Sequence, residues 1–592
     1  MIKHLKGLNI NSIYDFDNAF SINELLCKFW EKIEETIIIS NESIDILNWI
    51  KENGLAKEVE KFIQGLVEDG TIERMINVDK IEELRTLITN KITDVRSRLD
   101  IIENNAKHII NVTNENYEEC IANMKDGYIF NIIEDITINK TIDFSKLNNI
   151  EFRCNSVIRV TDDFSSKSKS IINFNKCNDV IFECKELDLE NKELFDSDGM
   201  NFIVLFTDCE DVSVINTKII NGINIKGLSS AVNGVSSTKI GKRFTVDNLI
   251  VKNCRSAVFT QYKGNTIENV KAYNTNDAII ALNGENCNNS YINNCYCEYN
   301  NGFPLIAVEN NASVININNC VARNCRGLFE LFGLPNNNVD VMVPQKGSIN
   351  ISNSTHILDD GGFVYDSSVT LSTISLRRGV EKYVNINIDK VDCYNTTQIP
   401  SNYVYIADTS LNNSVLKNFT ISNSNVFINK AKDYIILFNA SVKNLTLRNN
   451  KFEGVDTNNG WFLRHTRDSI IIDNLIINDC VIDGFQKSLS ADFVYNDFIK
   501  SFTMKNTRFY NTNAVCFNYP NGKIYHNDYN IQMFLNDYTL SNRGCSRVVY
   551  ERSLQPPTVG KWFAGDIAIN KFNHEEYYYN GSEWFKRSFK SQ

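Results

Sequence analysis

A short pattern that recurs along the middle of the chain constrains the fold more than any other feature. From Asn319 it reads "NCVARNC", which is polar, apolar, any, apolar, any, Asn, small. Clear copies begin at Asn248, Asn269, Asn294, Asn319, Ser348, Asn418, Asn444, Asn474 and Ser501, and looser ones at Asn149, Asp179 and Asp211. The step runs from 21 residues (Asn248 to Asn269) to 37 (Asp211 to Asn248), and a further copy is expected near Asn385.

Each copy alternates with period two, which indicates a short strand rather than a helix. Clusters of Asn, Gly, Asp and Ser between the copies supply turns. A strand–turn unit of this length, repeated about a dozen times, predicts a parallel β-solenoid whose coils stack about 4.8 Å apart. The Asn suits a turn, because it tolerates left-handed backbone and its amide can bond an identical neighbour. A leucine-rich horseshoe is the alternative, but its consensus is absent.

A second series of strands follows about ten residues later in several coils, as in "AIIALN", "PLIAVEN" and "GLFELF". The cysteines of "INNCVARNC" fall into columns of the first series. Cys325 shares its column with Cys254, Thr275, Asn300, Ser354, Ser424, Cys480 and Thr507, and Cys320 shares another with Cys295, Leu249 and Phe419. Because each cysteine is interchangeable with small or apolar residues, the columns predict packing rather than metal or disulfide chemistry. No metal or other cofactor is expected.

Composition excludes two classes of protein. The 592 residues are 43% hydrophobic and 22% charged, which is ordinary for a globular protein, so extensive disorder is not expected. The net charge of −11 argues against a nucleic-acid partner, because binding nucleic acid needs a basic face.

The sequence shows no signal peptide and no run of 18 apolar residues, so we expect no membrane insertion. We expect synthesis in a cytosol, which would keep the 16 cysteines reduced.

The two ends differ from the middle. Residues 1–110 carry a capping box at Ser21 and Glu24, followed by helical patterns. From Ile81 to Ile102 apolar residues recur at spacings of three and four, which predicts an oligomeric coiled coil or, alternatively, one amphipathic helix packed on its own domain. Residues 541–592 lose the Asn pattern and contain Asn580–Gly581, a hairpin signal, so we expect a small C-terminal β module after a β-helix over 111–540.

These ends carry a resemblance. "YDFDNAFSINELLCKFWEKIEETI" and "EVEKFIQGLVEDGTIERMIN" resemble the N-terminal regions of pre-neck appendage and tail-fibre proteins of phages that infect Gram-positive bacteria. "PPTVGKWFAGDIAIN" and "YYYNGSEWFKR" are similar to C-terminal modules of phage fibres, and the solenoid resembles the pectate-lyase-like fold. The resemblance implies a mainly β protein with a right-handed parallel β-helix. It also implies a homotrimer attached by its N-terminus to other tail or collar proteins of the virion, which binds a host polysaccharide or teichoic acid and sometimes cleaves it.

Cleavage would need paired carboxylates on the outer surface of the solenoid. In the second series of strands, Glu309 and Glu330 occupy positions of the same parity on strands one coil apart, so both side chains are expected on the same face. Strand geometry then places their Cα atoms about 8 Å from each other. Asp277 lies in "NTND", which resembles the Asn-Thr-Asp segment of polygalacturonase-type hydrolases. The resemblance implies that Asp277 has the role of that family's catalytic aspartate. That family's Gly-His-Gly is missing, and Asp359 and Asp360 of "LDDGG" are expected several coils away.

The alternatives for these residues are structural. Asp277 would cap a turn, and both glutamates would be solvated. The acidic patch with Glu193, Asp196 and Asp198 lacks the glutamate of a calcium loop and indicates a surface turn. Two functions therefore stay open: a trimeric virion adhesin that only binds a glycopolymer, or a tailspike that hydrolyses it with Asp277, Glu309 and Glu330. A secreted enzyme is disfavoured by the helical N-terminal region.

Overall fold

This computed structural model describes residues 108–587, with gaps at 166–169, 195–200, 226–229, 237–240, 284–286, 288, 310–313, 333–346, 364–370, 379–382, 407–415, 432–433, 457–460, 465–469, 485–486, 490–498, 506, 513–531, 536–546, 551–555, 557–563, 566 and 571–572. The chain divides into two units, Met1–His108 and Ile109–Gln592. The predicted helical region and coiled coil of residues 1–110 lie outside the described residues up to position 107.

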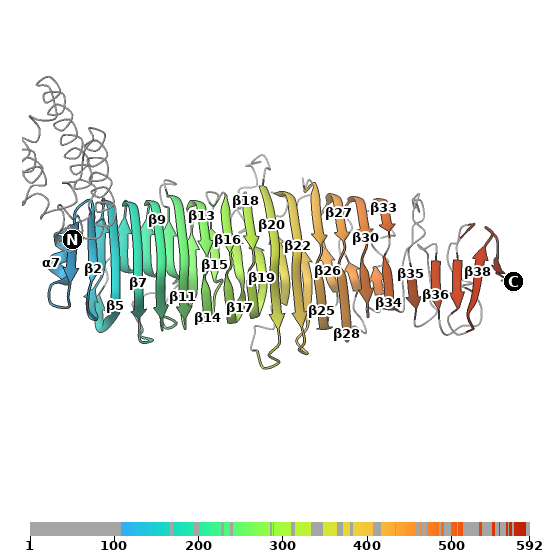
Figure 1. Cartoon of the computed structure of the whole chain (residues 1–592), viewed down its shortest axis with the longest axis horizontal. Helices are drawn as coiled ribbons and strands as arrows, with labels where there is room; N and C mark the ends of the chain where they lie inside the picture. Colours follow the sequence, from blue (N-terminus) through green and yellow to red (C-terminus); the bar gives the residue numbers. More distant parts are fainter. Residues whose placement is uncertain are drawn as a thin grey trace, which may run out of the picture. The chain divides into compact units, whose positions relative to one another are not determined.

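Ile109–Gln592 is built from parallel strands that stack side by side, coil upon coil, as Figure 1 shows. Each coil has three faces, which we call A, B and C in chain order. Face A contains the first parts of β9 (Glu210–Ile220) and β11 (Lys242–Lys252), β13 (Lys263–Glu268), β16 (Ser290–Asn293), β18 (Val314–Asn318), the first parts of β20 (Gly347–Leu358) and β22 (Tyr383–Asn395), β24 (Asn418–Ser422), β27 (Val442–Arg448) and β30 (Ile472–Asn478). These pairings confirm the predicted parallel β-helix.

Faces B and C complete each coil. Face B contains the second parts of β9 and β11, β14 (Lys271–Thr275), the first parts of β17 (Tyr296–Glu309) and β19 (Val321–Phe332), the second parts of β20 and β22, β25 (Asn425–Lys430) and β28 (Lys451–Asp456). Face C contains β8 (Phe202–Thr207), β10 (Ser230–Val235), β12 (Ser256–Thr260), β15 (Ile280–Asn283), the last parts of β17 and β19, β21 (Leu371–Arg378), β23 (Ser401–Ile406) and β26 (Tyr434–Phe438).

From the coil of β9 to the coil of β19, two turns per coil, not one, use a left-handed residue, which is an asparagine at every position but one. The turn from A to B holds Asn216, Asn248, Asn269, Asn294, Asn319, Asn353, Asn423 and Asn449, at φ between 45° and 56°. The turn from B to C holds Asn221, Asn253, Asn274, Tyr299 and Asn324, at φ between 50° and 61°. The predicted register merged the two columns and is wrong in this respect, because both turns need a left-handed residue followed by a small one and therefore produce the same letters.

The merged register placed Cys325 correctly beside Asn300 but put Ser354 in the wrong column. Cys325 stacks on Asn300 at the start of the B-to-C turn. Ser354, predicted in the Cys325 column, instead accepts a hydrogen bond from the backbone N–H of Cys320 at 3.0 Å. The strand expected near Asn385 is confirmed, since Asn385 pairs with both Ser348 and Asn418 on face A.

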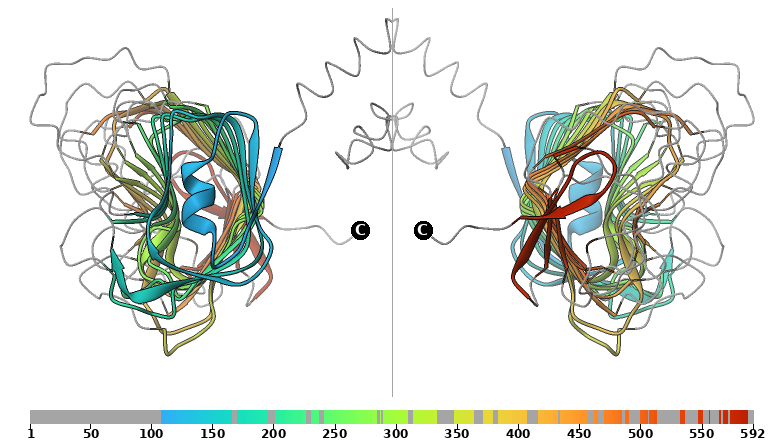
Figure 2. Two further views of the ribbon diagram at one scale, coloured as in Figure 1. Left: turned by 90° about the vertical axis from the view of Figure 1, so that its left-hand side faces the viewer. Right: turned by 90° about the vertical axis from the view of Figure 1, so that its right-hand side faces the viewer.

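The core is a column of apolar side chains that runs through the coils. Near its N-terminal end it is aromatic: Phe152 and Phe182 stack at 4.9 Å between ring centroids, and Phe174 and Phe206 stack at the same distance. The short helix α7 (Tyr117–Ala122) lies across the N-terminal end of the coils (Figure 2). Its Tyr117 and Cys120 belong to the core cluster, so the helix covers apolar side chains that the first coil would expose.

The cysteines lie inside this core. All 13 cysteines of the described segments are buried thiols. Several stack in adjacent coils, as Cys154 does on Cys184. Cys297 and Cys325 have their sulfur atoms 2.9 Å apart. Burial raises the pKa of Cys254 and of Cys287 to about 12, so these thiols behave as small apolar groups.

Near the C-terminus, β36 (Arg547–Tyr550) and β37 (Ile567–Asn570) pair in parallel, and β38 (Glu575–Tyr579) and β39 (Trp584–Lys586) are antiparallel. Asn580–Gly581 joins β38 to β39, with Gly581 at φ 104°, which confirms the predicted hairpin. The boundary near residue 541 stays a prediction. Within the described segments, no helix has the length and apolar character needed to cross a membrane.

Candidate active site

The predicted carboxylates lie on the outer side of face C and at the B-to-C turn that leads into it. On face C the inward column contains Ile280, Ile306 and Phe329, which are fully buried in the core. Their neighbours along each strand point outward, because successive side chains alternate between the two faces of a strand. The outward positions are Ala281 and Asn283 on β15, Ala307 and Glu309 on β17, Glu330 on β19, and Ser375 on β21. Glu309 and Glu330 therefore share a face, in the register that the alternation predicts.

Asp277 lies in the B-to-C turn between β14 and β15. Its Oδ1 accepts a hydrogen bond from the backbone N–H of Ala278 at 2.8 Å, and its Oδ2 forms an ion pair with Nε of Arg255 at 3.2 Å. Arg255 lies at the same turn one coil earlier. The side chain keeps about a fifth of its surface open to solvent, at 22%.

Glu309 ends β17 on the outer side of face C. Its Oε2 accepts a hydrogen bond from Nδ2 of Asn283, the paired residue one coil earlier, at 2.5 Å. Burial raises the pKa of Glu309 above its ordinary value, the Asn283 amide opposes this shift, and the charge of Asp277 adds to it. Asp277 and Glu309 are therefore within electrostatic reach of each other.

Glu330 is buried, with 3% of its side chain exposed. It forms ion pairs with Arg326, four residues earlier on β19, and with Nε of Arg377 on the next coil, where Oε1 lies 2.8 Å away. Two guanidinium groups stabilise the carboxylate and block its approach to a ligand. This arrangement differs from the solvated glutamate of the alternative interpretation.

Two exposed aromatic side chains lie along the B-to-C turn of β17, one coil after the turn that holds Asp277. Phe303 is 39% exposed, and the guanidinium of Arg326 lies 5.5 Å from its ring centroid. Tyr299 is 38% exposed and lies beside Asp360, whose charge and hydrogen bond raise the pKa of the phenol. Sequence reasoning missed both aromatics and the three arginines, although the B-to-C register would have placed Phe303 and Arg326 at the turn.

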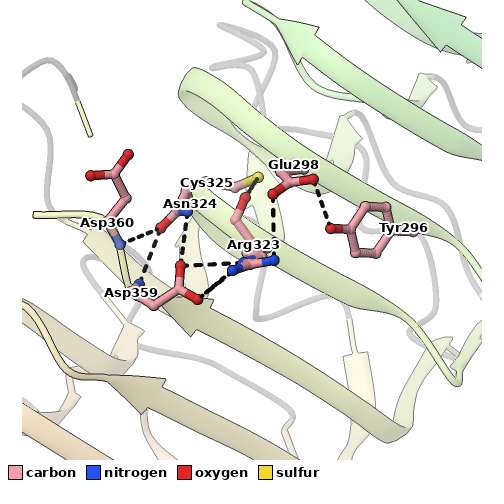
Figure 3. A network of polar contacts seen from close by, with 7 residues as sticks. All are labelled: Tyr296, Glu298, Arg323, Asn324, Cys325, Asp359 and Asp360. Carbon is pink, nitrogen blue, oxygen red and sulfur yellow. Dashed lines mark hydrogen bonds and ion pairs between the residues drawn. The ribbon is translucent and has the colours of Figure 1, made fainter. Parts of the chain in front are cut away.

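The turn is held on its face-B side by a second network, shown in Figure 3. Arg323 forms a bidentate contact with Asp359, with its nitrogens 2.8 and 3.1 Å from Oδ2, and reaches Glu298 at 3.5 Å. Asn324 donates to Asp359 Oδ1 at 3.0 Å and accepts from the backbone N–H groups of Asp359 and Asp360. These contacts fix the "LDD" turn, which follows the Asp277 turn by three coils, as the prediction of several coils requires.

The arrangement can bind a polymer that carries hydroxyl groups. Aromatic rings offer apolar platforms, and carboxylates, amides and guanidinium groups offer partners for hydroxyl groups. Among the described residues, no group of three or more His, Cys, Asp and Glu side chains could hold a metal ion. Of the acidic patch near residue 195, Asp196 and Asp198 lie outside the described residues.

Comparisons with known proteins gave matches among solved structures alone. No protein-family model matches the chain, and no curated protein matches it. An endo-xylogalacturonan hydrolase from Aspergillus tubingensis is similar over 72% of this chain and 95% of its own, at 11% identity and a TM-score of 0.35. The tailspike protein of E. coli bacteriophage HK620, in complex with a pentasaccharide, is similar over 81% of this chain and 74% of its own, at 11% identity and a TM-score of 0.39. The catalytic domain of a GH87 α-1,3-glucanase is similar over 72% of this chain and 68% of its own, at 14% identity and a TM-score of 0.34.

Proposed function

We propose that this chain is a phage tail appendage that binds a glycopolymer of the host cell wall at the B-to-C turn. The binding surface, which we call the turn site, comprises Asp277, Tyr299, Phe303 and Glu309. One observation carries the proposal: two large aromatic side chains stand exposed on the turn that bears Asp277 one coil earlier and that leads into face C, where Glu309 lies. Exposed aromatics beside hydrogen-bonding groups match a sugar, which has apolar ring faces and a polar rim.

The geometry of the coils favours a polymer over a small ligand. Successive coils repeat about every 4.8 Å, so the turns form a continuous ridge along which a chain molecule can lie. The polar groups of this ridge are held in place by Arg255, Arg323 and Asn324, which reduces the entropy lost on binding.

The wider assignment rests on the sequence resemblance. We propose a homotrimer with a right-handed β-helix, the usual hand of parallel crossovers, and a coiled coil in residues 1–110. That region would attach to other tail or collar proteins of the virion, and residues 541–592 would form a terminal module. Assembly would take place in the cytoplasm of a Gram-positive host, whose polysaccharide or teichoic acid is the receptor.

The test is binding of the purified full chain to isolated cell walls of Gram-positive bacteria, measured by co-sedimentation. The double substitution Tyr299→Ala and Phe303→Ala should abolish binding, because it removes both platforms. Tyr291→Ala is the matched control: this residue is 39% exposed but lies on face A, so the variant should bind like the parent. Equal binding by all three proteins would refute the turn site.

Hydrolysis of the bound polymer is a second candidate function. It is favoured by the closeness of Asp277, which forms an ion pair with Arg255, to Glu309, whose raised pKa suits a general acid. We propose Glu309 as the acid and Asp277 as the base or nucleophile. Glu330 takes no part in this proposal as an acid or base, because Arg326 and Arg377 occupy its oxygens.

This candidate is tested by incubating the chain with wall polymer and measuring new reducing ends or released phosphate. Glu309→Gln and Asp277→Asn should each lower the release at least about a hundredfold while binding persists. If both variants release products as the parent does, Glu309 and Asp277 are not the catalytic residues and the reaction takes place at another site. Binding of the polymer without any release of products would rule out hydrolysis and support the adhesin function.

A further inference from the structure

Three apolar side chains form one column on the outer side of face B, which we call the face-B column: Ile357, Tyr394 and Phe427. Tyr394 pairs with Ile357 on the coil before it and with Phe427 on the coil after it. The residue that precedes each of them in its strand is buried in the core, so the three side chains point outward. Tyr394 is 38% exposed, and the other two are half-buried. Single apolar residues are common on protein surfaces, whereas an adjoining set of them indicates a contact surface.

Charged residues end the column on both sides. Before it in the ladder stands Arg323, which is held by Asp359. After it stands Glu453, which forms an ion pair with Lys451 at 2.7 Å. The apolar part of this outer surface therefore extends over three coils and no further.

Hydrogen-bonding groups flank the column. Asp392 and Asn425 stand two residues before Tyr394 and Phe427 on the same outward side. Oδ1 of Asp392 accepts a hydrogen bond from the backbone N–H of Asn425 at 2.7 Å, and Oδ2 accepts one from the phenol of Tyr394 at 3.4 Å. The carboxylate is thus fixed in place and keeps acceptor capacity on Oδ2 for the hydroxyl group of a ligand.

The size of the column decides between a second copy of the chain and a smaller ligand. Three side chains of at most about 250 Å², each no more than 38% exposed, together present less than about 300 Å². A stable protein interface needs about 800 Å² from each partner. Apolar faces of this extent beside a fixed acceptor match a few sugar rings, which have apolar faces and hydroxyl groups at their rim.

The column continues the ridge that begins at the turn site. Tyr394 occupies the register of Glu298, the residue next to Tyr299, three coils further on. Three coils measure roughly 14 Å at the spacing of parallel strands, which is the length of about three sugar units. The network of Arg323 and Asp359 in Figure 3 lies on the coils between them. A polymer held at Tyr299 can therefore reach Tyr394 and Phe427 along the same surface.

We propose that the face-B column is a second set of subsites for the polymer that the turn site binds, and that this polymer is a polysaccharide with sugar rings in its main chain. The inference rests on the proposed function and deepens it, because it chooses between the two classes of receptor. Aromatic side chains pack against the apolar faces of sugar rings, and a chain of alditol phosphates has no such face. Its phosphates would also meet the negative charge of Asp392.

The test measures binding of the full chain, by isothermal titration calorimetry, to wall oligosaccharides of two lengths, about three and about ten sugar units. The short fraction fills the turn site alone, whereas the long fraction also reaches the face-B column and should bind more than tenfold more tightly. Tyr394→Ala combined with Phe427→Ala should lower the affinity for the long fraction about tenfold or more, the usual loss for an anchoring aromatic side chain, and leave the short fraction unchanged. Tyr291→Ala, at an exposed tyrosine on face A, is the matched control and should alter neither affinity.

Unchanged binding of the short fraction shows that a variant is folded. Tyr394→Phe keeps the ring and should keep the gain of the long fraction. The inference is overturned if the long fraction binds no more tightly than the short one, or if its gain survives the double substitution. It is also overturned if oligo(glycerol phosphate) binds as tightly as the long oligosaccharide and depends equally on Tyr394. In each of these cases short-fraction binding that depends on Phe303 would still support the proposed function, whereas a parent chain that binds neither fraction would overturn both.

Discussion

Replacing Asn294 separates the two roles that an asparagine plays in these turns. Asn294 is exposed at the A-to-B turn, with φ 53°. Its Nδ2 donates to Oδ1 of Asn269 at 2.5 Å, and its Oδ1 accepts from Nδ2 of Asn319 at 3.2 Å. The side chain therefore links three consecutive coils, while the backbone holds a conformation that most residues avoid.

The expected cost follows from these two roles. Asn294→Ala loses two exposed hydrogen bonds, about 0.5 kcal/mol each, and places Ala in the left-handed region at about 1–2 kcal/mol. The free energy of unfolding should thus fall by about 2–3 kcal/mol. Asn294→Gly loses the same bonds but avoids the backbone strain, and should cost about 1 kcal/mol less than Ala.

Urea unfolding of the full chain, followed by far-ultraviolet circular dichroism, measures both variants. Asn425 provides the matched control: it is exposed, its side chain bonds Asp392 at 3.3 Å, and it lies in strand β25. There the order should reverse, with Gly less stable than Ala by about 0.5–1 kcal/mol. If Ala is as stable as Gly at position 294, the left-handed turn does not explain the recurrent asparagine.

Three further predictions concern packing, titration and reactivity. Gly327→Ala should destabilise the β-helix by about 3 kcal/mol in urea unfolding, because a Cβ there would lie 2.1 Å from the carbonyl oxygen of Ser372, whereas Gly361→Ala, with open space, should cost little. Glu309→Gln should stabilise the fold at pH 7 but not at pH 4. The pKa of Glu309 is higher in the folded chain than in the unfolded one, so its carboxyl group lowers the free energy of unfolding as the pH rises above the unfolded pKa, whereas glutamine does not. The same pH dependence of the free energy of unfolding in the variant and the parent would contradict this. Cys254 should resist a thiol reagent until the chain unfolds, with mass spectrometry as the readout, and rapid labelling in the native state would contradict its burial.

The parallel β-helix was predictable because its signal is repeated in every coil. Alternation marked the strands, and Asn580–Gly581 marked the last hairpin. The register was only partly predictable. Asn253 and Asn423 occupy different turns, yet each is a left-handed residue followed by a small one, so a single letter pattern describes both. Cross-strand pairing, which the sequence does not state, is needed to tell them apart.

The candidate site was predictable in position but not in environment. Parity placed Glu309 and Glu330 on one face, and the register agrees. Their surroundings depend on residues from other coils: Asn283 contacts Glu309, while Arg377 reaches Glu330 from β21 through a bulge. Nothing in the local sequence of either glutamate signals these partners, because they come from neighbouring coils.

The most direct test of the turn site is a structure of the full chain with a bound fragment of the wall polymer. We predict that the fragment lies along the B-to-C turn, with a sugar ring against Phe303 and a hydroxyl or glycosidic oxygen at Glu309. Ligand density on face A, or density that makes no contact with Phe303 and Glu309, would contradict the account.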